Sequence, residues 1–168
     1  YDFSGRSRKP QMALAAQYGF EEYAQPAGGC CFLTDENFSR KLADLWQARG
    51  SKEYDLDDIM LLKMGRHIRP APNYKLIIAR EDGENRFMGG YRKRFHTVRD
   101  LDNPGPLALV QGEPSTADLE TAARITARYG KGRSAETVQA EITPPGGAPY
   151  VTEVAPMPPA QIAEEWHV

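Results

Sequence analysis

Hydrophobic residues recur at helical spacing in the first third of the chain. The clearest case is the set Phe38, Leu42, Leu45 and Trp46. These positions follow i, i+4, i+7 and i+8, so their side chains share one face of a helix. We expect this helix to be capped by Thr34 or Asp35 and to end at Gly50.

Two shorter helices are predicted on either side of this segment. Residues 9–18 show a helical pattern that Gly19 stops, and Pro10 is tolerated in the first turn. Residues 56–64 form the other helix, with Asp55 or Ser51 as the N-terminal cap and Gly65 at the end.

The pattern changes at Arg69-Pro-Ala-Pro72, where two prolines break a helix and predict an extended connection. Beyond it, β-branched and aromatic residues predict strands. The expected strands cover residues 74–79, 95–98, 107–111, 136–142 and 150–154. Three helices are expected among these strands. A short one passes through Phe87 and Met88, a long one covers residues 116–129 with Ser115 as its N-terminal cap, and a last short one covers residues 160–166.

This order of elements predicts an α+β fold. Residues 1–68 would be a helical segment around a cysteine-containing loop, and residues 69–168 a small mixed α/β domain with a mostly antiparallel sheet. At 168 residues the chain is long enough to bury a core.

Charge is unevenly distributed, although the formal total is only -2. From Lys63 to Arg99 there are ten basic and three acidic residues, whereas from Ser134 onward there are five acidic residues and no Lys or Arg. A basic middle and an acidic tail favour a face that binds a polyanion. Tyr91, Phe95 and His96 lie among the basic residues and could stack on unpaired bases. A solvated surface over core aromatics is the alternative interpretation.

Both cysteines of the chain, Cys30 and Cys31, follow two glycines and precede the predicted cap of the next helix. Glycines leave the backbone sterically open, and a helix N-terminus lowers the pKa of a nearby thiol. Either cysteine could therefore be a nucleophile. Two ordinary buried cysteines are the competing interpretation.

The residues around the cysteines resemble a known segment. Arg8-Lys-Pro-Gln-Met-Ala-Leu-Ala, then Pro26-Ala-Gly-Gly-Cys and Cys31-Phe-Leu with an aromatic residue seven positions on, are similar to the region after the ATP-pyrophosphatase domain of tRNA 2-thiouridylases. In those enzymes a Cys-Phe-Ile stretch carries the cysteine that accepts sulfur as a persulfide. The resemblance makes Cys31 the matching residue, with Cys30 as the alternative.

The second half resembles the RNA-binding domain of NFACT proteins, a version of which is appended to thiouridylase-like and ThiI-like proteins. The matching residues are Lys75-Leu-Ile-Ile-Ala-Arg80 and the turn ending in Glu84-Asn85. They are similar to a Gly-Arg-Asn-x-x-Glu-Asn signature, with Ala79 in place of the glycine and Glu81 in place of the asparagine.

No cofactor is expected in this chain. It lacks the Ser-Gly-Gly-x-Asp-Ser loop of ATP pyrophosphatases and the Gly-x-x-x-x-Gly-Lys-Ser/Thr loop. His67, His96 and His167 are scattered and the cysteines are adjacent, so no metal site is expected either. The thiouridylase resemblance implies ATP only in a missing N-terminal domain.

These resemblances lead to the hypothesis that the chain is the C-terminal portion of a tRNA-modifying sulfurtransferase, in which Cys31 supplies sulfur to an activated uridine. The resemblance implies tRNA as a partner, with a sulfur-donor protein as a further one. The residues expected to contact RNA are Arg6, Arg8, Lys9, Lys63, Arg66, Arg69, Arg80, Asn85, Arg92, Lys93 and Arg94.

Two other functions are compatible with the same residues. One is an RNA-binding module with structural cysteines and no chemistry. The other is a protein-interaction domain whose basic stripe meets an acidic partner.

A cytoplasmic protein without a membrane partner is expected. No apolar run approaches the roughly 18 residues of a membrane span, and the first residues lack the apolar core of a signal peptide. Adjacent cysteines bridge each other only with strain, which favours a reducing compartment. Because the chain begins without Met and in a structured-looking segment, we expect it to be the later part of a longer protein.

Overall fold

The structure, a computed structural model, describes residues 9–20 and 35–168. The chain divides into two units, residues 1–32 and 33–168. Within the first unit, helix α1 spans Lys9–Gln17 and confirms the helix predicted there. Cys30 and Cys31 lie outside the described residues.

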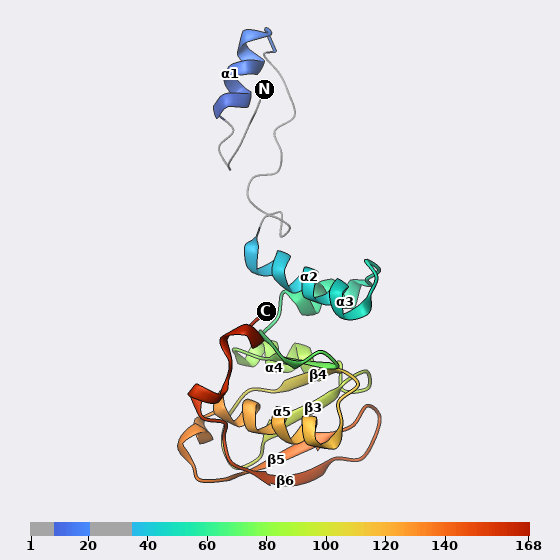
Figure 1. The fold of residues 1–168 in the computed structure, drawn as a ribbon, viewed down its shortest axis with the longest axis vertical. Coiled ribbons are helices and arrows are strands. Elements are labelled where there is room, and N and C mark those ends of the chain that lie inside the picture. Colours follow the sequence, from blue (N-terminus) through green and yellow to red (C-terminus); the bar gives the residue numbers. More distant parts are fainter. Residues whose placement is uncertain (1–8, 21–34) are drawn as a thin grey trace. The chain divides into compact units, whose positions relative to one another are not determined.

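The second unit combines a six-stranded sheet with helices (Figure 1). Its α-helices are α2 (Glu36–Arg49), α3 (Leu56–Leu62), α4 (Asp82–Gly89) and α5 (Thr116–Arg128). Its strands are β1 (Arg66–Ala71), β2 (Tyr74–Ile78), β3 (His96–Asp100), β4 (Ala108–Gly112), β5 (Val138–Thr143) and β6 (Tyr150–Val154). Short 3-10 helices are η2 (Lys131–Ser134), η3 (Pro159–Gln161) and η4 (Glu164–Trp166).

The strands lie in the order β1-β2-β4-β3-β5-β6, and every neighbouring pair is antiparallel. The α+β class predicted from the sequence is therefore confirmed. Strand β4 lies between β2 and β3, so the chain leaves β2, forms α4, and returns two positions away in the sheet.

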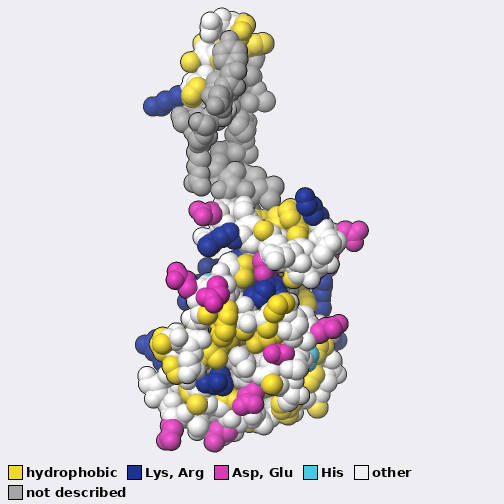
Figure 2. All heavy atoms as spheres, in the orientation of Figure 1, with side chains coloured by type: hydrophobic (Ala, Val, Ile, Leu, Met, Phe, Trp, Pro, Cys, Tyr) yellow, Lys and Arg dark blue, Asp and Glu magenta, His cyan; other side chains and the backbone are white. Residues whose placement is uncertain are grey.

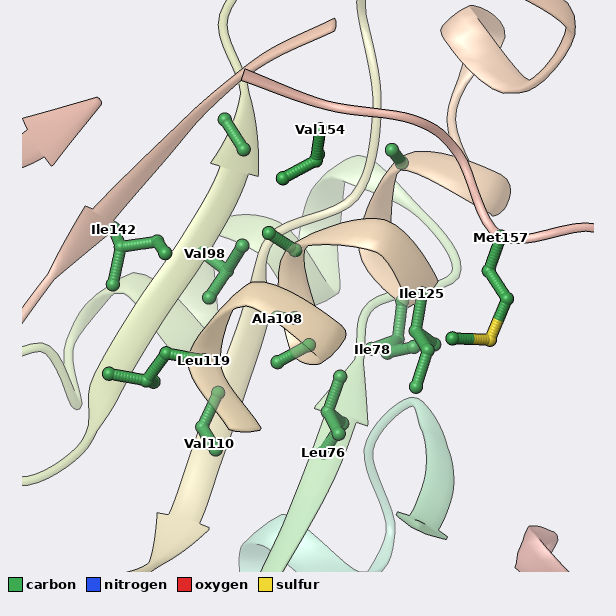
Figure 3. Close-up of a cluster of buried hydrophobic side chains, with 14 of the residues drawn as sticks. Leu76, Ile78, Val98, Ala108, Val110, Leu119, Ile125, Ile142, Val154 and Met157 are labelled. Atoms are coloured by element: carbon green, nitrogen blue, oxygen red, sulfur yellow. The ribbon is translucent and has the colours of Figure 1, made fainter. Parts of the chain in front are cut away.

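Helix α5 covers one face of the sheet. Alternate residues of the strands point toward it, as expected for a period of two. Leu119 and Ile125 of α5 pack with Leu76, Val98 and Ile142 of the sheet, all buried (Figure 3). The Ser115 side chain accepts a hydrogen bond from the amide of Asp118, which confirms the predicted cap.

Helices α3 and α4 cover the other face of β2 and β4. Leu61 of α3 and Met88 of α4 pack against Ile77 and Leu109 of the strands. Helix α2 then packs on α3 through the apolar face predicted for it, including Phe38. Its helical caps are Asp35, which accepts from the amide of Phe38 at 2.8 Å, and Gly50 at φ 66.

The strand β1 is the main difference from the sequence prediction. Residues 69–72 were expected to be only an extended connection, with a domain boundary at 68/69, but β1 pairs with β2 through this point. Pro70 is tolerated because β1 lies at the edge of the sheet, and the register shifts between Ile68 and Ala71. The helix expected at 160–166 is instead two 3-10 turns.

Candidate functional site

A groove with a volume of about 580 Å³ lies where several loops of the second unit meet. Its walls come from the start of β1, the β2–α4 turn, the β3–β4 loop and the segment after α5. An adjoining hollow of about 420 Å³ shares Arg66, Tyr129 and Arg133 with it. We call the two together the cationic groove, after its basic lining residues Arg66, Arg80, Arg128, Lys131 and Arg133.

The short helix η2 presents two of these cations, Lys131 and Arg133, to solvent. Its sequence is Lys131-Gly-Arg-Ser134; Gly132 is buried while Lys131 and Arg133 are exposed. A Cβ at Gly132 would lie 2.5 Å from Asn103 Nδ2 and 2.6 Å from an Asp100 carboxylate oxygen. Only glycine allows η2 to pack this closely on the β3–β4 loop, and this packing turns the two flanking cations outward.

Arg66 lies over the ring of Tyr129, with 5.3 Å between the guanidinium carbon and the ring centroid. This distance is within the range of a cation–π contact. Burial raises the pKa of Tyr129, against the opposing effect of Arg66 and Arg128, so the phenol stays neutral at neutral pH. Tyr129 packs on the main core, which holds the ring in place beneath the exposed Arg66.

The β2–α4 turn is held by a buried carboxylate. Glu84 accepts hydrogen bonds from the backbone amides of Arg80 at 2.6 Å and Gly65 at 3.0 Å, and from Arg80 Nη2 at 2.9 Å. Burial acts to raise the pKa of Glu84, but these hydrogen bonds outweigh it and hold the pKa below its ordinary value. The adjacent Asn85 accepts from the amide of Leu107 at 2.8 Å and so ties the turn to the β3–β4 loop.

The region that contains this groove matches a known family. Residues 65–167 match the family of the NFACT protein RNA binding domain. The match includes every basic residue of the cationic groove and more than half of the chain. The chain belongs to this family. It therefore carries an RNA-binding domain, whose start at residue 65 coincides with the beginning of β1.

The fold of the NFACT domain is also found in a solved structure. The C-terminal region of the fibronectin/fibrinogen-binding protein from Streptococcus suis is similar, with a TM-score of 0.52 and 15% sequence identity. The similar part covers 62% of this chain and 50% of that chain, so this chain spans about half the length of that structure. At this identity the likeness shows the fold alone. A comparison with curated proteins gives no match.

These comparisons support the NFACT resemblance seen in the sequence and do not support the thiouridylase resemblance. They favour the alternative of an RNA-binding module over the sulfurtransferase. The signature residues Glu84 and Asn85 have structural roles in the NFACT domain, as anchors of the turn that borders the groove.

The basic residues predicted to contact RNA fall into separate places. Arg66, Arg80 and Asn85 line the cationic groove. Arg69 lies elsewhere, in a two-pronged ion pair with Asp44 of α2, and Arg80 itself is paired with Glu84.

At the end of α4, Arg94 pairs with Asp55 and Asp57 at 2.9 Å each, while Arg92 and Lys93 are exposed. Lys63 is half-buried after α3. Lys9 begins α1 in the other unit, and Arg6, Arg8 and both cysteines lie outside the described residues. The predicted residues that the structure describes are thus not gathered into one site.

Arg128, Lys131 and Arg133 line the groove but are not among the residues predicted from the sequence to contact RNA. Their segment lies outside the basic stretch from Lys63 to Arg99, so local charge density gave no signal. Gly132 is the one sequence signal nearby, because a glycine flanked by two cations is consistent with the close packing that presents them.

On the face shown in Figure 2, acidic and basic side chains are interspersed rather than gathered into one large patch of either sign. Residues 9–20 and 35–168 contain no cluster of His, Cys, Asp and Glu that could hold a metal ion. Their helices include none long and apolar enough to span a membrane.

Proposed function

We propose that this NFACT domain binds RNA by holding the phosphate backbone along the cationic groove, and that the RNA is a tRNA. The observation that carries the proposal is the lack of internal acidic partners. In the part of the chain that the structure describes, no ion pair is made by Arg66, Arg128, Lys131 or Arg133.

Cations that have no acidic partner within the protein are available to bind the phosphates of a polyanion. Binding of RNA phosphates to such side chains releases condensed counterions, which makes the affinity strongly dependent on salt. Phosphate contacts position an RNA without reading its sequence. The choice of tRNA rests on the resemblance of residues 8–38 to thiouridylases.

The test compares two exposed cation pairs in the same domain. Labelled tRNA is titrated with the wild type, with Lys131→Ala/Arg133→Ala, and with Arg92→Ala/Lys93→Ala, and fluorescence anisotropy is recorded at several salt concentrations. We expect only the η2 variant to bind weakly, with a salt slope reduced by about 1.5 for two lost phosphate contacts.

Circular dichroism of each variant confirms that the fold is unchanged. A larger loss for Arg92→Ala/Lys93→Ala would place the RNA at the end of α4 and contradict the groove. Absence of tRNA binding by the wild type even at low salt would contradict the proposed function and favour the interaction-domain alternative.

The sulfurtransferase hypothesis is a separate and finer proposal that depends on Cys30 and Cys31. Its support is the sequence around them, two adjacent thiols behind two glycines. Alkylation of the native protein at neutral pH tests it. If Cys31 is labelled faster than free cysteine, a low-pKa thiol is supported. If the cysteines are inert, the sulfurtransferase hypothesis is contradicted and the RNA-binding module is the remaining function.

A further inference from the structure

The pair formed by Arg66 and Tyr129 points to a more specific ligand than RNA phosphates in general. Arg66 is exposed and lines both parts of the cationic groove, while Tyr129 beneath it packs on the core. The guanidinium carbon lies over the ring, 5.3 Å from its centroid, and both side chains line the groove.

The guanidinium of Arg66 also has no competing partner. Among residues 9–20 and 35–168 its side chain makes no hydrogen bond or ion pair, unlike Arg69 and Arg94, whose carboxylate partners hold them. A planar cation held on a ring by one face can accept a nucleobase on the other, because guanidinium planes stack on bases as aromatic rings do.

We propose that Arg66, supported by Tyr129, is a stacking platform for an unpaired base, so that the groove takes a single-stranded segment of RNA. This inference rests on the proposed function, since it requires that RNA binds in the groove. Beyond that function, the inference specifies that the bound RNA is single-stranded and that the guanidinium of Arg66 holds the base.

Shape favours the same conclusion. A volume of about 580 Å³ is typical of pockets that enclose a small molecule, and so suits a nucleotide that leaves its helix. Bases of an A-form duplex are stacked inside the helix, and proteins recognise such duplexes over a long and shallow surface. Single strands are instead held in basic grooves that contain stacking side chains.

The polarity of the groove orients the segment. Lys131 and Arg133 lie on the η2 side, whereas the exposed carboxylates of Glu81 and Asp82 line the side formed by the β2–α4 turn. Carboxylates repel phosphates and accept hydrogen bonds from base amino groups or hydroxyls. The backbone therefore follows η2, with the base directed toward Arg66 and the turn.

The experiment uses the full chain and a labelled single-stranded RNA of about 12 nucleotides, free or annealed to its complement. The key variant is Arg66→Lys, which keeps the charge but lacks the plane that stacks. The matched control is Arg92→Lys, the same exchange at an exposed arginine that lines neither part of the groove. Thermal unfolding verifies that both variants are folded.

We expect the single strand to bind more tightly than the duplex. Arg66→Lys should weaken single-strand binding about fivefold or more, the loss of one stacked base, whereas Arg92→Lys should change it by less than about twofold. A 2-aminopurine base in the strand should be quenched on binding to the wild type and to Arg92→Lys, and much less on binding to Arg66→Lys.

Equal or tighter binding of the duplex would overturn the inference and leave RNA binding by the groove intact. Equal effects of the two Arg-to-Lys exchanges would do the same, because they would show Arg66 acting as charge alone. Failure of every RNA to bind at low salt would instead remove the proposed function and this inference with it.

Discussion

At the scale of single residues, the domain contains polar groups whose protonation is decided by burial. His67 of β1 is buried, and its Nε2 lies 3.0 Å from the carbonyl oxygen of Met64 and 3.2 Å from that of Leu61. Since carbonyls only accept, Nε2 carries the proton and donates it. Nδ1 is buried and has no hydrogen-bond partner among the residues that the structure describes, so a second proton there would bury an unpaired charge.

Burial lowers the pKa of His67 well below its ordinary value, and the positive charges of Lys75 and Lys41 lower it further. Below about pH 6.5 His67 is therefore protonated in the unfolded chain while it stays neutral in the folded chain. Stability is complete above the unfolded pKa of about 6.5 and falls as the pH drops below it.

We predict that His67→Gln flattens this dependence. The free energy of unfolding of the wild type should fall by up to about 1.4 kcal/mol per pH unit below pH 6.5 through His67, in addition to smaller effects from other groups such as His96. Urea unfolding between pH 7 and pH 5 measures the slope. The control His167→Gln alters an exposed histidine and should keep the wild-type slope; equal slopes in all three proteins would contradict the assignment.

At the scale of elements, helix α2 is joined to the sheet by charge as well as by apolar packing. Asp44 of α2 accepts hydrogen bonds from Lys75 Nζ of β2 and Arg69 Nη2 of β1, each at 2.9 Å. The Lys75 side chain is only 2% exposed and depends on this carboxylate for compensation. Burial acts to raise the pKa of Asp44, but Arg69 and Lys75 outweigh it and lower the pKa.

We predict that Asp44→Ala lowers the free energy of unfolding by about 3 kcal/mol, because it leaves the buried Lys75 without a counter-charge. Lys75→Met removes that charge, so Asp44→Ala/Lys75→Met should be more stable than Asp44→Ala alone. Urea denaturation of the wild type and the three variants forms a double-mutant cycle. Additive losses of less than about 1 kcal/mol would show that the pair behaves like an exposed one.

At the scale of the whole molecule, the second unit contains three clusters of buried apolar residues, and together they include segments on both sides of residue 68. Leu61 and Met64 of the α3 region pack with Met88 and Leu109. Ile68 of β1 joins the cluster beneath α5. Helix α3, expected to belong to a separate segment, therefore packs in one cluster with strands β2 and β4.

We predict that a fragment of residues 33–168 folds cooperatively and that one of residues 69–168 does not. The shorter fragment loses α3 and half of β1, which exposes the apolar surface of β2 and removes its hydrogen-bonded neighbour. Circular dichroism and thermal unfolding distinguish the two. A cooperative transition for 69–168 near that of 33–168 would support the boundary expected from the sequence.

The sequence by itself determined the local structure and the family. Helix limits follow from caps such as Asp35, Asp55 and Ser115, whose side chains bond to amides three residues on. These interactions involve near neighbours and are readable without a fold. The strand-and-turn residues around Arg80 and Asn85 likewise carried the NFACT resemblance, because backbone anchors need particular side chains.

Tertiary structure alone decided which cations remain unpaired. Arg69 and Arg66 stand three residues apart in one strand, yet Arg69 is neutralised by Asp44 from α2 while Arg66 lies on Tyr129. Their partners are 25 and 63 positions distant in the sequence. Lys131 and Arg133 join Arg66 in one groove only because the sheet order and η2 bring these segments together. Electrostatic interaction depends on distance in space, and that distance is set by the fold.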